Sequence, residues 1–181
     1  FREMDAERLR LEDMTFDRAF CRFGLMLMPD AARALREMHR VLVPGGRVAV
    51  AVWSVQQKVN TLGIVRRALE RHDAFHPPPG APDFFRFGQA GAVERALRQA
   101  GFRSVRSERM TVEWVFKEPD EFWDSMKRGP SLQRALAKVS PAVRRAVKAD
   151  VVRALEKFRR RGKLRIPNEA VLAVGVKERA P

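Results

Sequence analysis

Two short groups of residues near the start of the chain are placed where they could bind a ligand. Asp5 and Ala6 end a segment that reads as the tail of a strand, and a polar loop follows them. Arg22 and Phe23 come at the end of a second, apolar run. Open α/β sheets bind ligands at the carboxyl ends of their strands. Taken alone, neither group identifies a ligand, because short polar stretches of this kind are common on surface loops; the place of each group at a strand end is what makes it of interest.

The elements around Arg22 are predicted to form a strand-helix-strand unit. Residues 16–23 are apolar enough for a strand that helices cover on both faces. Asp30 is a good helix cap, and apolar side chains at helical spacing predict a helix over 30–42. Pro44-Gly45-Gly46 stops this helix and turns the chain, and 47–53 is a strand rich in β-branched residues. Such a unit is the repeating element of a parallel α/β sheet.

The rest of the chain alternates helices and strands. The spacing predicts helices over 59–72 and 89–100, a proline-rich loop over 76–82, and a strand over 102–116. A helical stretch follows over 119–160, with Ser140 as an internal cap and Gly162 at its end, and a buried strand over 168–177 is the last element. One apolar stripe runs along the helical stretch through Leu132, Leu136, Val139, Val143, Val147, Val151, Leu155 and Phe158.

The segment Arg40-Val41-Leu42-Val43-Pro44-Gly45-Gly46-Arg47 resembles the turn after a helix in class I S-adenosylmethionine-dependent methyltransferases, as does Asn168-Glu169-Ala170 before the last strand. The closest resemblance is to the methyltransferase type 11 group, which includes ubiquinone and menaquinone biosynthesis enzymes. It implies an α/β, Rossmann-like sheet of order 3-2-1-4-5-7-6, of which this chain carries strands 3 to 7. Residues 1–118 and 166–181 would form the C-terminal part of that domain. Residues 119–165 would be a helical insertion before the last strand, where a substrate cap often sits.

The resemblance also implies a cofactor and its contacts. Asp5 and Ala6 would hold the adenine of S-adenosylmethionine, and Arg22 and Phe23 would lie along its methionine end. The acceptor would be a small molecule, and no catalytic base can be named; His39 is expected on a solvent-facing helix position. The family's first strand, glycine-rich loop and second strand with its ribose-binding acid do not precede residue 5, and the chain starts without Met. We therefore expect a fragment that binds the cofactor weakly.

Several other classes of protein find little support in the sequence. His39, His72 and His76 lack metal-ligand spacing, no Walker-type phosphate loop is present, and no apolar run reaches 18 residues. Cys21 is the single cysteine, which excludes an internal disulfide and favours a reducing, cytoplasmic location. A packed core cysteine is the commoner role for such a residue than a catalytic thiol.

The net charge of +14 leaves a second function open. Residues 127–165 hold 14 basic and 2 acidic residues, so this segment carries nearly all of the excess. Such a stripe could bind nucleic acid or an anionic surface, and it is more often a solvated helix face. A third interpretation is an inactive methyltransferase remnant.

Overall fold

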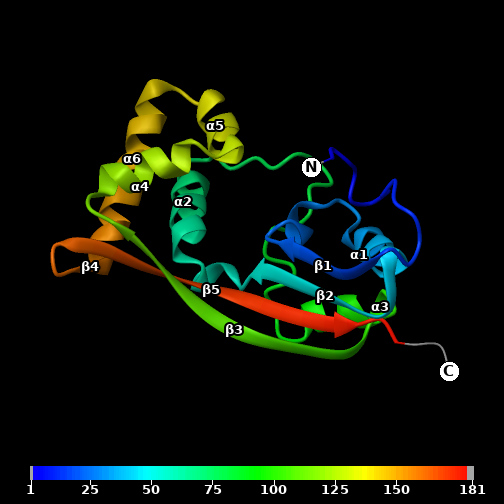
Figure 1. The fold of residues 1–181 in the computed structure, drawn as a ribbon. Coiled ribbons are helices and arrows are strands. Elements are labelled where there is room, and N and C mark those ends of the chain that lie inside the picture. The colour runs from blue at the N-terminus through cyan, green and yellow to red at the C-terminus, as the bar shows by residue number, and fades with distance from the viewer. Residues whose placement is uncertain (1, 179–181) are drawn as a thin grey trace. The chain divides into compact units, whose positions relative to one another are not determined.

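The computed structural model describes residues 2–178, apart from the side chains at 130 and 131. The chain forms two compact units (Figure 1). The first unit comprises residues 1–55, 80–110 and 169–181, and the second comprises 56–79 and 111–168. Two long strands run from one unit into the other, and each unit is described by itself.

A parallel pair of strands starts the first unit. Strand β1 (Phe16–Arg22) pairs in parallel with β2 (Leu42–Trp53), and helix α1 (Ala31–Val41) connects them. The Asp30 side chain accepts a hydrogen bond from the Arg33 amide at 2.9 Å, which confirms the predicted cap. The apolar stripe of α1 is buried, with Leu35 fully covered. The predicted strand-helix-strand unit is therefore confirmed.

The Pro44-Gly45-Gly46 segment differs from the prediction in detail. It does not form a turn ahead of the strand but lies within β2, where the pairing with β1 shifts register between Phe16 and Arg18. Gly45 has φ +85°, a conformation that favours glycine. Its amide donates to the Lys177 carbonyl at 2.7 Å, and the Lys177 amide donates to Gly46 at 2.9 Å. The glycines therefore let the strand begin early and stay paired.

Two further long strands complete the sheet, in the order β1-β2-β5-β3. Strand β5 (Lys163–Val176) pairs antiparallel to β2, while β3 (Arg103–Phe116), which follows helix α3 (Ala92–Gln99), is the end strand. This arrangement matches the 4-5-7-6 part of the expected order and confirms the Rossmann-like fold class. The last strand begins earlier than predicted, at Lys163, and lies inside the sheet as the expected order requires.

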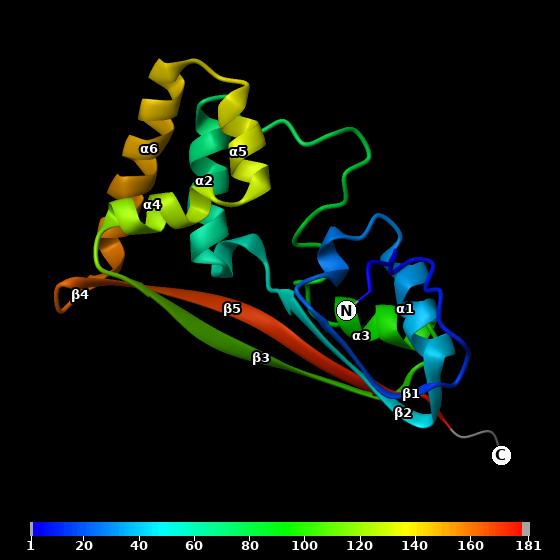
Figure 2. The ribbon, with the colours of Figure 1, turned by 45° about the horizontal axis from the view of Figure 1, so that its top comes forward.

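The second unit is a helical cluster (Figure 2). Its helices are α2 (Asn60–Arg71), α4 (Pro119–Lys127), α5 (Pro130–Ala137) and α6 (Pro141–Leu155). The predicted apolar stripe forms the core of this unit together with α2 and the start of β5. Its fully buried members are Ile64, Phe122, Val147, Val151, Leu155, Leu164 and Ile166. After α6, a short turn η3 (Glu156–Phe158) leads into β4 (Arg159–Arg160), which forms a hairpin with β5 that the sequence did not predict.

Two predictions about the first strands are wrong. Residues 2–5 form no strand, because within the described part of the chain no strand lies beside them to share hydrogen bonds; Phe1 lies outside the described residues. Strand β1 is not buried on both faces either, since Phe16 is 38% exposed and Phe20 is 78% exposed. The face that carries these two side chains is therefore at least partly exposed.

Candidate functional site

The carboxyl end of β1 is a tight turn that presents Arg22 and Phe23. Phe23 has φ +55°, which is uncommon for a residue with a side chain, and its amide donates to the Ala51 carbonyl at 2.8 Å. Its ring stacks on Trp53 at the end of β2, with 4.2 Å between ring centroids. The Arg22 side chain is exposed, and its guanidinium has no hydrogen-bond or ion-pair partner within residues 2–178. The stacked rings therefore fix the turn and leave Arg22 available.

Cys21 lies one residue before this turn and is a packing residue. Its side chain is 7% exposed. Burial raises the pKa of the Cys21 thiol, and hydrogen bonds from the Gly24 and Leu25 amides only partly offset this effect. A thiol with a raised pKa is a weak nucleophile at neutral pH. The structure thus agrees with the core role rather than a catalytic one.

The loop that contains Asp5 and Ala6 is fastened to α1. The Glu7 carboxylate accepts from the Asp30 amide at 2.8 Å, and the Glu37 carboxylate accepts from the Leu9 amide at 2.8 Å. Arg40 donates to the Leu9 carbonyl at 3.0 Å and to Glu37. The carboxylates of Glu7 and Glu37 therefore hold the loop against the helix.

These contacts place both predicted pairs near one end of α1. Asp5 is exposed, and its Oδ1 accepts from the Glu7 amide at 2.9 Å. Glu7 in turn holds Asp30 at the start of α1, and the chain reaches Asp30 from Arg22 through the short turn η1 (Leu25–Leu27). No hydrogen bond or ion pair within residues 2–178 joins Asp5 or Ala6 directly to Arg22 or Phe23.

A polar network at the end of β2 was not predicted from the sequence. The buried Ser54 hydroxyl donates to Glu169 Oε1 at 2.6 Å and accepts from Arg109 Nη1 at 2.6 Å. Arg109 also contacts Glu169 at 2.7 Å and donates to the Gly88 carbonyl at 3.0 Å. Ser54 directly follows β2, and the other residues come from β5, β3 and a loop, so their sequence spacing does not predict the network. The network joins the strand ends beside the candidate site.

A second arginine that the sequence analysis missed holds the turn after β1. Arg86 Nη2 donates to the Met28 carbonyl at 2.6 Å, while Nη1 is buried and has no partner within residues 2–178. Burial lowers the pKa of Arg86, although the nearby Asp83 opposes this effect. Arg86 Nη2 therefore holds the turn through the Met28 carbonyl, while Nη1 stays buried without a hydrogen-bond partner among residues 2–178.

His39 is half-buried rather than solvent-facing. Its ring meets the edge of Phe102 with 5.0 Å between centroids, and Gly101 packs against it. Burial lowers the pKa of His39, with smaller contributions from Lys177 and Arg103. Within residues 2–178, no group of three His, Cys, Asp or Glu side chains is arranged to hold a metal ion. None of the helices in the same range is long and apolar enough to cross a membrane.

Part of the basic segment is neutralised by acidic side chains. Lys148 pairs with Asp120 at 2.5 Å, and Arg159 pairs with Glu156 at 2.8 Å. Asp150 accepts from Arg71 at 2.8 Å and contacts Arg153 at 3.3 Å, and hydrogen bonds from Arg71 hold its pKa below the ordinary range. Asp150 and Glu156 are the two acids already counted in the +12 of residues 127–165, so among these contacts it is the Lys148–Asp120 pair that offsets part of the excess.

The chain has a Rossmann-like fold, and comparisons with known proteins find similarity to methyltransferases over its first 50 residues. The model of the methyltransferase domain family matches residues 1–50. The ubiquinone/menaquinone biosynthesis C-methyltransferase of Idiomarina loihiensis is 48% identical over 52 residues, which are 29% of this chain and 21% of that relative. The demethylmenaquinone methyltransferase of Staphylococcus epidermidis is 52% identical over 44 residues, 24% and 18% of the two chains. The matched part spans about a fifth of these relatives.

Solved structures resemble the chain over almost its whole length. The YcgJ protein of Bacillus subtilis covers 99% of this chain and 71% of its own, with a TM-score of 0.59 and 16% identity. A candidate methyltransferase from Bacillus halodurans gives a TM-score of 0.58 with 18% identity, over 99% of this chain and 78% of its own. The resemblance to class I S-adenosylmethionine-dependent methyltransferases is thereby confirmed, in sequence for residues 1–50 and in fold for the whole chain.

Proposed function

We propose that the protein transfers a methyl group from S-adenosylmethionine to a small-molecule acceptor. The observation that carries the proposal is the agreement between sequence match and fold. The family match covers residues 1–50, which contain the loop at Asp5 and the turn at Arg22, and both lie near the start of α1. This is the end of a parallel strand pair at which open α/β sheets bind ligands.

The residues present fit two parts of the cofactor. The Asp5 carboxylate is exposed and uses only Oδ1 in its contact with the Glu7 amide, so it can accept from the adenine amine. The exposed Arg22 guanidinium can donate to the carboxylate at the methionine end. The φ of +55° at Phe23 keeps the backbone of the turn close to the strand end. When bound, S-adenosylmethionine supplies an activated methyl group on a sulfonium.

The acceptor belongs to the same proposal. The two curated relatives named above act in quinone biosynthesis or on demethylmenaquinone, as their names say, which supports a small, ring-containing acceptor. Positioning the acceptor and excluding water are the tasks left to this chain, since methyl transfer from a sulfonium needs an aligned nucleophile. No general base is assigned. The cap role of 119–165, a segment that follows β3 and reaches into the start of β5, and the cytoplasmic location stay predictions.

Affinity for S-adenosylhomocysteine, the demethylated cofactor, tests the two contacts. We expect Asp5→Ala and Arg22→Gln each to weaken binding to the 181-residue chain about five- to tenfold, because the first removes the acceptor for the adenine amine and the second removes the charge that faces the ligand carboxylate. Arg18→Gln is the matched control, because Arg18 is exposed on β1 and, within residues 2–178, its guanidinium donates to the Asp17 carbonyl alone. Isothermal titration calorimetry or a fluorescence competition assay measures the change.

The Arg18→Gln control separates binding at a site from attraction by general charge. If Arg18→Gln weakens binding as much as Arg22→Gln, general charge rather than a site holds the ligand. If wild type shows no binding and the variants do not differ, the two contacts are wrong for this chain. The inactive-remnant alternative predicts the same absence of binding.

A further inference from the structure

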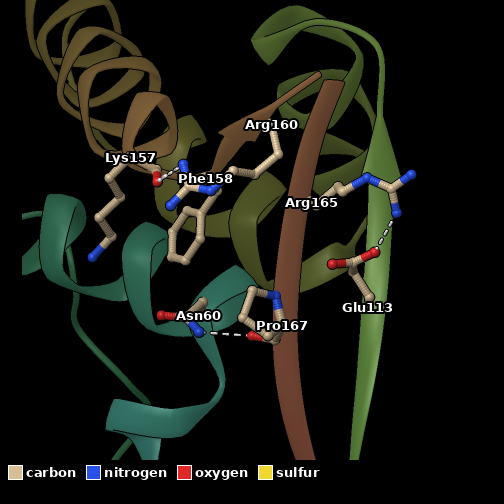
Figure 3. A pocket seen from close by; sticks show the side chains of 7 residues that line it. All are labelled: Asn60, Glu113, Lys157, Phe158, Arg160, Arg165 and Pro167. Carbon is tan, nitrogen blue, oxygen red and sulfur yellow. Dashed lines mark hydrogen bonds and ion pairs between the residues drawn. The ribbon is translucent and has the colours of Figure 1, made fainter. Parts of the chain in front are cut away.

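The second unit carries a hollow of about 500 Å³ that is separate from the residues assigned to methyl transfer (Figure 3). All of the residues that line it belong to 56–79 and 111–168. They come from the start of α2, from the η3–β4 turn, and from the neighbouring strands β3 and β5. The β4–β5 hairpin thus brings together side chains that are far apart in the sequence.

The lining of this hollow is positively charged. It contains the cations Lys157, Arg160 and Arg165 and one carboxylate, Glu113. Arg165 Nη1 bonds Glu113 at 2.6 Å, and Figure 3 shows this pair reaching from β5 to β3. That pair is neutral, so Lys157 and Arg160 leave the hollow with a net charge of +2.

The two remaining cations have no acidic partner among residues 2–178. Arg160 Nη1 donates to the backbone carbonyls of Lys157 at 3.1 Å and of Arg159 at 2.8 Å. These bonds fix the guanidinium in place and leave its charge uncompensated. The Lys157 ammonium lies 4.9 Å from the centroid of the Phe158 ring, a cation–π contact that does not neutralise it either.

Phe158 supplies a flat apolar surface next to the cations. Its side chain is half-buried and packs against the core of the second unit on one side. In Figure 3 the ring lies between Lys157 and Asn60. Asn60 is the first residue of α2, and its Nδ2 donates to the Pro167 carbonyl at 2.7 Å, which holds the positive end of the helix dipole beside the hollow.

From this arrangement we propose that the hollow binds a phosphate monoester whose ester group is planar. A phosphate monoester carries close to two negative charges at neutral pH, which match the net +2 of the lining. Arg160 supplies directed donors to phosphate oxygens, and Lys157 supplies a point charge. The planar group packs on the Phe158 ring. This site is independent of the proposed methyl transfer.

Phenyl phosphate is a suitable probe, because it combines one monoester with one ring. Titration into the full 181-residue chain, followed by backbone amide NMR, should shift resonances of 157–160 and of Asn60. We expect Lys157→Gln and Arg160→Gln each to weaken binding at least fivefold. Inorganic phosphate and phenol, tested separately, should each bind more weakly than phenyl phosphate. In Phe158→Leu, phenyl phosphate should bind no more tightly than inorganic phosphate, and the affinity for inorganic phosphate should be unchanged. The amide spectrum of this variant must be that of a folded protein.

Lys163→Gln is the matched control, since Lys163 is an exposed cation in the same hairpin that does not line the hollow. The proposal requires less than a twofold effect from it. Equal weakening by Lys163→Gln overturns the proposal. The absence of shifts at about 10 mM probe also overturns it, because this concentration is several times a dissociation constant of about 1 mM, the value expected for so small a ligand. A single-stranded oligonucleotide gives one more outcome that would overturn the proposal. It would have to bind more tightly than phenyl phosphate and lose affinity equally in Lys157→Gln, Arg160→Gln and Lys163→Gln. The basic residues would then form an extended nucleic-acid surface.

Discussion

At the scale of single residues, Glu37 explains how a loop without strand partners stays ordered. Its carboxylate accepts from the Leu9 amide and from Arg40 Nε, both at 2.8 Å, and the side chain is 19% exposed. The hydrogen bond from Arg40 is the main reason why the pKa of Glu37 lies below its ordinary value, against the opposing effect of partial burial. The ionised form is therefore the form that stabilises the folded chain.

The depressed pKa of Glu37 determines how its contribution to stability changes with pH. Because the folded pKa of Glu37 is depressed, its stabilisation is fully present above the ordinary glutamate value, near pH 4.5, and is lost as the pH falls through the folded pKa. Between pH 7 and pH 3 we expect wild type to lose about 1–2 kcal/mol more unfolding free energy than Glu37→Gln. Urea unfolding at several pH values measures this difference.

Two features make the comparison specific. Glu12→Gln removes an exposed carboxylate that has no side-chain contact within residues 2–178, and it should keep the wild-type pH dependence. His39, whose pKa burial lowers, also favours the unfolded chain once the pH falls below the ordinary histidine value. That contribution is common to all three chains and cancels. Identical pH profiles for wild type and Glu37→Gln would contradict the role given to Glu37.

At the scale of elements, the start of α2 depends on a residue 107 positions later in the chain. Val59 precedes the helix and provides no side-chain cap. Asn168 Oδ1, from β5, accepts from the Thr61 amide at 3.0 Å and from the Thr61 hydroxyl at 2.8 Å, and its Nδ2 donates to the Ile166 carbonyl at 3.0 Å. Asn168 is completely buried. It therefore performs for α2 the task that a neighbouring Ser or Asp usually performs.

Removal of this side chain should be costly. We expect Asn168→Ala to lower the free energy of unfolding by about 2 kcal/mol, because the Thr61 amide and hydroxyl would stay buried without partners. Chemical denaturation followed by circular dichroism measures the loss. Asn60→Ala is the control, since it deletes one half-buried hydrogen bond to the Pro167 carbonyl and should cost about 1 kcal/mol or less. An equal loss in both variants would show that Asn168 does not act as the cap.

The same element shows what the sequence could and could not predict. The apolar spacing over 59–72 predicted the helix with Leu62, Val65, Ala68 and Leu69 inward; the last three are buried and Leu62 is half-buried. Its cap was not predictable, because a side chain from another element supplies it. The β4–β5 hairpin was missed for a different reason: Arg159 and Arg160 carry no alternating pattern, and only their pairing with Leu164 and Lys163 defines them as a strand.

At the scale of the whole molecule, the sheet order was predictable and the ends of the sheet were not. The apolar strand at 47–53 and the Pro-Gly-Gly segment before it indicated the central strand β2, and the structure confirms it. The tail predicted over residues 1–5 failed because a strand needs a neighbour, whatever its own composition. For the candidate site, the sequence indicated Asp5, Ala6, Arg22 and Phe23, whereas the Ser54–Glu169–Arg109 network arises only when four segments meet.

The central claim is that a class I methyltransferase site lies where the loop at Asp5 and the turn at Arg22 meet the start of α1. Its most direct test is backbone amide NMR of the 181-residue chain during titration with S-adenosylhomocysteine, which detects even millimolar binding. The account predicts progressive shifts at residues 5–7 and 22–25, with no shifts in α6. An unchanged spectrum at saturating ligand, or shifts confined to residues 127–165, would contradict it.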